Sequence, residues 1–163
     1  MKTLGKIFLF APLFAFLLLS CSDEAESVDD LVKEGDFKIS ELAGNWEATY
    51  ANFNDGAQQS VDVVGDGGTV SMTVQSSGRF TITINPADRD AYTASGEMFW
   101  EEFEGDYYFA IEWDDAPGDW DTYGATLTAT TFSINGGFDS AEYDFDNDGT
   151  FEECSLSIGF DRV

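Results

Sequence analysis

The chain has 163 residues, with 32 acidic side chains, 7 basic ones and no histidine, so its formal net charge is −25. The lack of histidine excludes Ser-His-Asp and Cys-His nucleophile pairs and His-ligated metal or haem sites, and the negative charge excludes binding to the phosphate backbone of nucleic acid. With 43% hydrophobic and 15% aromatic residues, the chain has enough apolar material for one folded domain.

Residues 1–20 have the pattern of a secretory signal. Lys2 and Lys6 precede an apolar run over residues 7–19, which is short for a membrane span and is followed by an acidic stretch. The signal ends in Leu18-Leu19-Ser20-Cys21, which resembles the lipobox of bacterial lipoproteins. This resemblance implies a palmitate-type acylation of Cys21 as the first mature residue, with each buried CH₂ contributing about 0.8 kcal/mol to membrane anchoring. The alternative is a secreted protein in which Cys21 forms a disulfide with Cys154.

Residues 21–38 are predicted to be the lipidated cysteine and an acidic tether, with at most a short helical piece around residues 28–33. The acidic stretch Ser22 to Ser27 is interpreted either as a solvated linker or as a signal that sends lipoproteins to the outer surface. We therefore expect a bacterial outer-membrane lipoprotein, facing the periplasm or the cell surface. Removal of residues 1–20 leaves 5 basic and 32 acidic side chains, a net charge of −27.

Residues 39–163 are predicted to be an all-β domain. Apolar and polar residues alternate in short segments such as 69–75, 80–84 and 153–162, and these segments are separated by Gly, Asn, Asp and Ser. Eight to ten such strands, without a crossover helix, favour an antiparallel up-and-down β-barrel or a sandwich. Irregular spacing in Thr93–Glu104 indicates a bulge, and a turn of helix capped by Ser40 is expected before the first strand.

The sequence Glu41-Leu42-Ala43-Gly44-Asn45-Trp46 resembles the Gly-x-Trp entry of the lipocalin and calycin superfamily. In that family a helical turn leads into the first strand, and a basic residue of the last strand packs across the tryptophan. The resemblance implies a lipocalin-like barrel closed by Trp46 and Arg162. By parity, Trp46, Ala48 and Tyr50 should share the inward face.

Asp144, Asp146 and Asp148 have the Asp-x-Asp-x-Asp-Gly spacing that opens a calcium loop. Glu152 would have to complete the ligand set, because position 155 is a serine where an EF-hand has glutamate. The alternative is a hairpin turn with solvated carboxylates. Calcium is therefore a possible cofactor, and no other cofactor is expected.

The other reactive or aromatic residues have simpler interpretations. Cys154 is expected to be a small buried residue rather than a catalytic thiol. The acidic loop that carries Asp114, Asp115, Asp119 and Asp121 is interpreted as solvated. Core filling is the default role of the tryptophans, although Trp100, Trp113 and Trp120 could form a sugar or lipid platform. Chance pairs of carboxylates do not make an active site, so no enzymatic activity is expected.

Two functions remain open from the sequence. In the first, the barrel binds a small apolar ligand, and residues such as Ala48, Gly96, Gly124 and Ala125 line a void. In the second, the protein is a non-enzymatic interaction or structural module, and large residues meet across a filled barrel. The second set consists of Tyr50, Phe80, Trp100, Phe109 and Leu127. An eight-stranded barrel is just wide enough for either outcome.

Overall fold

The computed structural model describes residues 31–57 and 59–163; Cys21 and the predicted signal lie outside them. These residues form η2 (Ile39–Leu42), β1 (Gly44–Asn54), β2 (Ser60–Asp62), β3 (Thr69–Val74), β4 (Arg79–Asn85), β5 (Tyr92–Phe103), β6 (Asp106–Trp113), β7 (Trp120–Leu127), β8 (Thr131–Gly136), β9 (Ala141–Tyr143) and β10 (Glu152–Arg162). The element η2 is a single turn of 3₁₀ helix. Across the described residues, we find no helix that could span a lipid bilayer.

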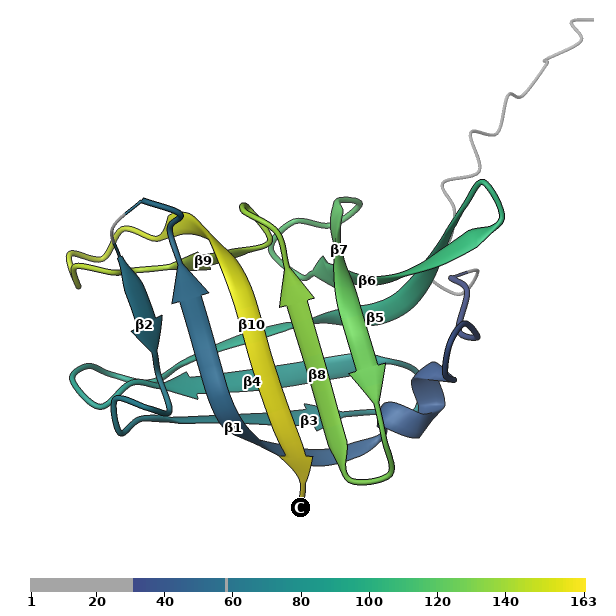
Figure 1. The fold of residues 1–163 in the computed structure, drawn as a ribbon, viewed down its shortest axis with the longest axis horizontal. Helices are drawn as coiled ribbons and strands as arrows, with labels where there is room; N and C mark the ends of the chain where they lie inside the picture. Colours follow the sequence, from purple (N-terminus) through teal and green to yellow (C-terminus); the bar gives the residue numbers. More distant parts are fainter. Residues whose placement is uncertain (1–30, 58) are drawn as a thin grey trace, which may run out of the picture.

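Eight of the strands close into an antiparallel up-and-down barrel (Figure 1). Their order is β1, β3, β4, β5, β6, β7, β8 and β10, and β10 returns to pair with β1. The two short strands β2 and β9 add to the end of β1 and the start of β10. The predicted all-β barrel is confirmed, and the sandwich alternative is excluded because the sheet closes on itself.

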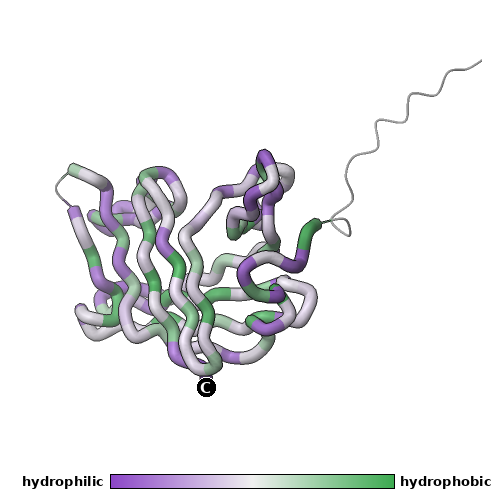
Figure 2. The backbone as a smooth tube through the Cα atoms, turned by 45° about the vertical axis from the view of Figure 1, so that its right-hand side comes forward, coloured by the Kyte–Doolittle hydropathy of each residue, from purple (hydrophilic) through white to green (hydrophobic). Residues whose placement is uncertain are grey.

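The alternation in the sequence positions the core. In β3, Val70, Met72 and Val74 are buried and the residues between them are exposed, and β4 buries every second residue in the same way. Hydrophobic and hydrophilic segments accordingly alternate along the strands in Figure 2. Because each fully buried apolar side chain contributes about 1.5–3 kcal/mol, this face fixes the register of each strand.

The first strand contains an irregularity that the sequence analysis missed. Pairing between β1 and β10 shifts between Ala48 and Tyr50, so Thr49 is an extra residue in β1. Beyond this point Ala51 and Phe53 take the buried positions. The inward position predicted for Tyr50 is therefore wrong, and its ring covers the position where a Cβ of Gly159 would lie.

The predicted bulge in Thr93–Glu104 is not found. The pairing of β5 with β6 runs without a shift from Gly96 opposite Trp113 to Phe103 opposite Asp106. The irregular spacing of the aromatic residues in β5 arises because Phe99 points to the outer face of the barrel. It is buried there, with its ring centre 5.7 Å from that of Trp120.

Residues 31–38, assigned to the tether from the sequence, pack against the barrel. The amide of Trp100 in β5 donates to the Val32 carbonyl at 2.8 Å, and Lys33 forms an ion pair with Glu97 at 2.6 Å. Residues 31–33 are not helical, and the 3₁₀ turn starts at Ile39 with Lys38 as its N-cap. The expected cap at Ser40 is thus wrong by two positions.

Candidate functional site

One end of the barrel is closed around Trp46 and Arg162. Trp46 is fully buried, and its Nε1 donates a hydrogen bond to the Leu42 carbonyl at 2.8 Å. The guanidinium carbon of Arg162 lies 4.0 Å from the centre of the Trp46 ring, a contact worth about 2 kcal/mol when desolvated. Arg162 also donates to the carbonyls of Glu41 and Ala43, both at 2.8 Å. The structure thus brings together the two residues that the sequence analysis paired.

Aromatic side chains fill the half of the barrel next to this closed end. Their ring centres lie 5.0–6.4 Å apart, and the members are Phe37, Trp46, Trp100, Phe109, Phe132 and Phe160. The Trp100 Nε1 donates to the Phe37 carbonyl at 3.0 Å, so the segment before η2 is held in this cluster by its backbone as well as by its ring. Two residues of the predicted filled-barrel set, Trp100 and Phe109, therefore meet here.

The opposite end of the barrel holds a cavity of about 780 Å³. Strands β1, β4, β5, β6, β7 and β10 contribute to its wall, which is largely apolar and aromatic. The apolar and aromatic lining residues include Phe53, Ile82, Ile84, Tyr92, Ala94, Trp113, Trp120, Phe151, Leu156 and Ile158. The volume lies within the range of about 300–1,000 Å³ typical of small-molecule sites. The barrel is thus filled at one end and hollow at the other.

The small residues expected around a void are not the ones that line it. Ala48, Gly96, Gly124 and Ala125 are absent from the wall of this cavity. The small residues that line it are Ala94, Ala116, Ser140 and Ala141. Gly96 instead allows close strand packing, because a Cβ there would overlap the backbone carbonyl of Glu112.

Five carboxylates stand at the mouth of the cavity, and we call them the mouth acids. They are Asp115, Asp119, Asp121, Asp139 and Glu142. Burial raises the pKa of Asp121 above its usual value, and the neighbouring carboxylates of Asp139 and Asp119 raise it further. Asp121 at the start of β7 therefore lies near Asp119 of the β6–β7 loop and Asp139 of the β8–β9 loop.

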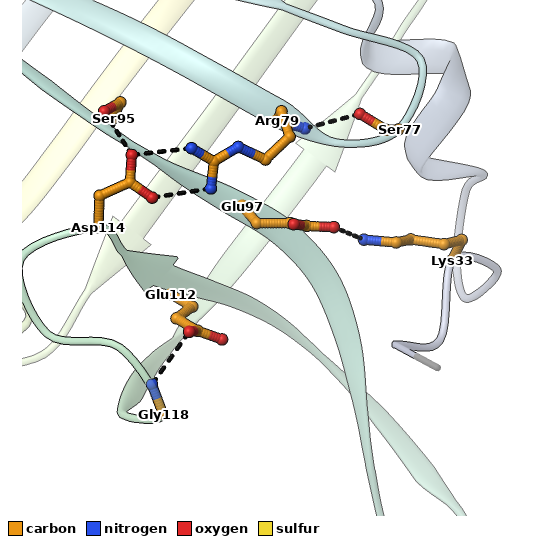
Figure 3. Close-up of polar contacts among 8 residues, drawn as sticks. All are labelled: Lys33, Ser77, Arg79, Ser95, Glu97, Glu112, Asp114 and Gly118. Carbon is orange, nitrogen blue, oxygen red and sulfur yellow. Dashed lines mark hydrogen bonds and ion pairs between the residues drawn. The ribbon is translucent and has the colours of Figure 1, made fainter. Parts of the chain in front are cut away.

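The β6–β7 loop that carries two of the mouth acids is fixed at both ends (Figure 3). Asp114 receives two hydrogen bonds from Arg79, at 2.7 and 2.8 Å, and one from the Ser95 hydroxyl at 2.6 Å. Farther along, the Gly118 amide donates to the Glu112 carboxylate at 3.0 Å. These contacts position Asp115 and Asp119 without using their side chains.

Asp144, Asp146 and Asp148 converge in the loop before β10. Ligand oxygens of all three lie within 4.8 Å of one another, and Asp144 is 8% exposed. Since calcium–oxygen distances are about 2.3–2.6 Å, oxygens at this separation fit around one ion. The amides of Asp148 and Gly149 donate to the Asp144 carboxylate at 3.1 and 3.0 Å, so the loop is also stabilised by its own backbone.

Glu152, the fourth predicted ligand, lies outside this group of three carboxylates. Its carboxylate accepts a hydrogen bond from the Phe145 amide at 3.2 Å. A guanidinium nitrogen of Arg89 donates to the backbone carbonyl of Asp144. Within residues 31–57 and 59–163, the three aspartates are thus the carboxylates that could share a metal ion.

Cys154 is fully buried on β10, and burial raises the pKa of its thiol to about 11. At neutral pH it is therefore protonated and shielded from reagents. This geometry agrees with the expected role of a small apolar residue.

The sequence predicts a solvated loop for Asp115, Asp119 and Asp121, and Asp115 and Asp119 are exposed as expected. The sequence does not indicate that Asp139 and Glu142 line the same cavity. The high density of acidic residues in 114–121 is a signal that could have indicated part of this group. Their proximity to residues 139–142 could not be predicted, because the two segments come together only in the closed barrel.

No protein-family model, curated protein or solved structure matches this chain.

Proposed function

We propose that this protein is a membrane-anchored bacterial lipoprotein whose barrel binds a small, largely apolar ligand. The observation that supports binding best is the apolar-walled cavity of about 780 Å³ at the end of the barrel opposite Trp46. The closed end is packed with aromatic rings, so a ligand would enter from the mouth. The anchoring part of the proposal depends on the resemblance of Leu18 to Cys21 to a lipobox.

Binding can be tested with N-phenyl-1-naphthylamine, an uncharged fluorescent probe, and the chain from Ser22 to Val163. This chain keeps every described contact of the barrel. We expect saturable fluorescence enhancement, and we expect Ala94→Phe, which fills part of the cavity, to weaken the affinity about tenfold. Ala129→Phe adds the same ring on an exposed turn at the closed end and should bind as the unmodified chain does. If the probe shows no saturable binding, the alternative of an interaction module becomes the better description.

Anchoring can be tested separately in cells. Radioactive palmitate should label the full chain, and the label should remain with the membrane fraction. A Cys21→Ser variant should lose both the label and the membrane association, because an acyl chain supplies the binding energy. Labelling that persists in Cys21→Ser would rule out this cysteine as the attachment site.

As a second candidate function, we propose that the Asp144 loop binds calcium and is stabilised by it. The approach of the three carboxylates to within 4.8 Å supports this proposal. At a calcium concentration 100 times the dissociation constant, binding would stabilise the fold by about 2.7 kcal/mol, and chelation would remove this stabilisation.

The test compares thermal unfolding with calcium and with a chelator. We expect a rise in the unfolding temperature with calcium that is lost in Asp146→Asn, Asp148→Asn. The control is Asp106→Asn, Asp161→Asn, which removes the same charge from exposed positions elsewhere. An equal calcium effect in both double variants would mean general screening of the negative surface, and the proposed site would be wrong.

A further inference from the structure

The cavity and its mouth differ sharply in chemistry. Deeper in the barrel, the wall is apolar, with Ile82, Ile84, Leu156 and Ile158, whereas the charged groups at the mouth are all carboxylates. A ligand that fills the site therefore places one part among apolar side chains and another part among the mouth acids.

None of the basic residues in the described part of the chain lines this cavity. These residues are Lys33, Lys38, Arg79, Arg89 and Arg162. The Arg79 guanidinium, on the loop side of the barrel, is held by both carboxylate oxygens of Asp114, as Figure 3 shows. The negative charge of the mouth is thus left without a neutralising partner from the cavity wall.

Two further observations concern the aromatic residues of the cavity wall. The hydroxyl oxygen of Tyr92 is buried and, among the described residues, has no hydrogen-bond partner. Tyr92 lines the cavity, as do Trp113 and Phe151, and Trp120 lies at its rim with its ring against Phe99 on the outer face. The faces of aromatic rings attract cations by their electron density, most strongly when the cation is partly desolvated.

We propose, on the basis of the binding function proposed above, that the ligand is a cationic amphiphile, an apolar chain or ring system that carries an ammonium group. Its apolar part lies among the isoleucine and leucine side chains, and its ammonium group lies between Asp121 and Asp139 near the Trp113 ring. The ligand neutralises charges that the protein holds together at the mouth.

The same geometry disfavours anionic ligands. A fatty-acid carboxylate in this cavity would bring a sixth negative charge close to the mouth acids, of which Asp121 is half-buried and the other four are exposed. The raised pKa of Asp121 has the same origin, since desolvation and the neighbouring carboxylates both disfavour its charged form.

The experiment compares three probes with the same decyl chain and different head groups, namely decyltrimethylammonium, 1-decanol and decanoate. Each is titrated below its aggregation concentration into the Ser22–Val163 chain by calorimetry. We expect the cation to bind at least about tenfold more tightly than the alcohol, and decanoate to bind more weakly than the alcohol.

Two double variants separate the mouth acids from the overall charge. Asp121→Asn, Asp139→Asn should reduce the affinity for the cation to that for the alcohol and leave the alcohol unchanged, which also shows that the barrel is folded. Asp106→Asn, Asp161→Asn removes the same charge from exposed positions away from the mouth and should leave the preference intact.

The outcomes distinguish this inference from the proposed function. Equal affinities for the three probes, or a preference that survives Asp121→Asn, Asp139→Asn, would overturn the cationic ligand and leave a binding barrel. Failure of all three probes and of the uncharged naphthylamine would overturn the binding function itself.

Discussion

Replacing Trp46 with alanine is expected to lower the free energy of unfolding by about 3–5 kcal/mol, the usual cost of removing a large buried aromatic side chain. Trp46 is 0% exposed, and its indole is fixed by the Leu42 carbonyl on one side and the Arg162 guanidinium on the other. The substitution removes both contacts and leaves a void beside Phe132. Urea unfolding followed by circular dichroism measures the loss.

Trp120→Ala is the matched control for this prediction. It deletes the same side chain at the open end, where Trp120 is 39% exposed and its ring packs against Phe99 at the outer face. We expect a loss of about 1 kcal/mol, in line with a partly exposed site. Equal losses in the two variants would contradict the view that Trp46 closes the barrel.

Replacing Gly78 with alanine is expected to cost about 3 kcal/mol or more. Gly78 lies in the turn between β3 and β4 with φ +99°, a conformation in which a side chain costs about 1–3 kcal/mol. A Cβ there would also overlap the backbone carbonyl oxygen of Met98, and the Gly78 carbonyl accepts a hydrogen bond from the Met98 amide at 3.0 Å. The alanine therefore adds a steric clash and weakens a contact between the turn and β5.

Gly105→Ala separates the two contributions. Gly105 has a similar φ of +91°, but no atom lies within 4 Å of its Cβ position. This variant should lose only the backbone strain, about 1–2 kcal/mol, as measured by urea unfolding. If the two alanine variants lose the same stability, the turn at Gly78 relaxes away from β5 and the clash is not significant.

The barrel could be predicted because apolar and polar residues alternate along the strands, and the structure shows the same alternation in burial. Alternation in β3 and β4 predicts which residues are buried because successive side chains of a strand point to opposite faces. The same parity argument, together with the Gly-x-Trp resemblance, placed Trp46 opposite Arg162.

The prediction from alternation is wrong for the second half of β1, because this strand contains an extra residue. The extra Thr49 in β1 moves Tyr50 to the outer face, and nothing in residues 44–54 alone indicates this, because a bulge is defined by the register of the partner strand. The packing of residues 31–38 could not be predicted for a related reason. Their few apolar residues, such as Val32 and Phe37, gain partners only from β5 and the aromatic cluster.

The sequence by itself determined the strand pattern, the charge, the absence of histidine chemistry and the expected export signal, because these are properties of single residues and of their immediate neighbours. The tertiary structure decided that the barrel is filled at one end and hollow at the other. A cavity is the difference between the volume that the closed sheet encloses and the side chains inside it. The tertiary structure also decided the composition of the mouth, because Asp121 and Asp139 come together only when β7 and the β8–β9 loop take their places around the barrel.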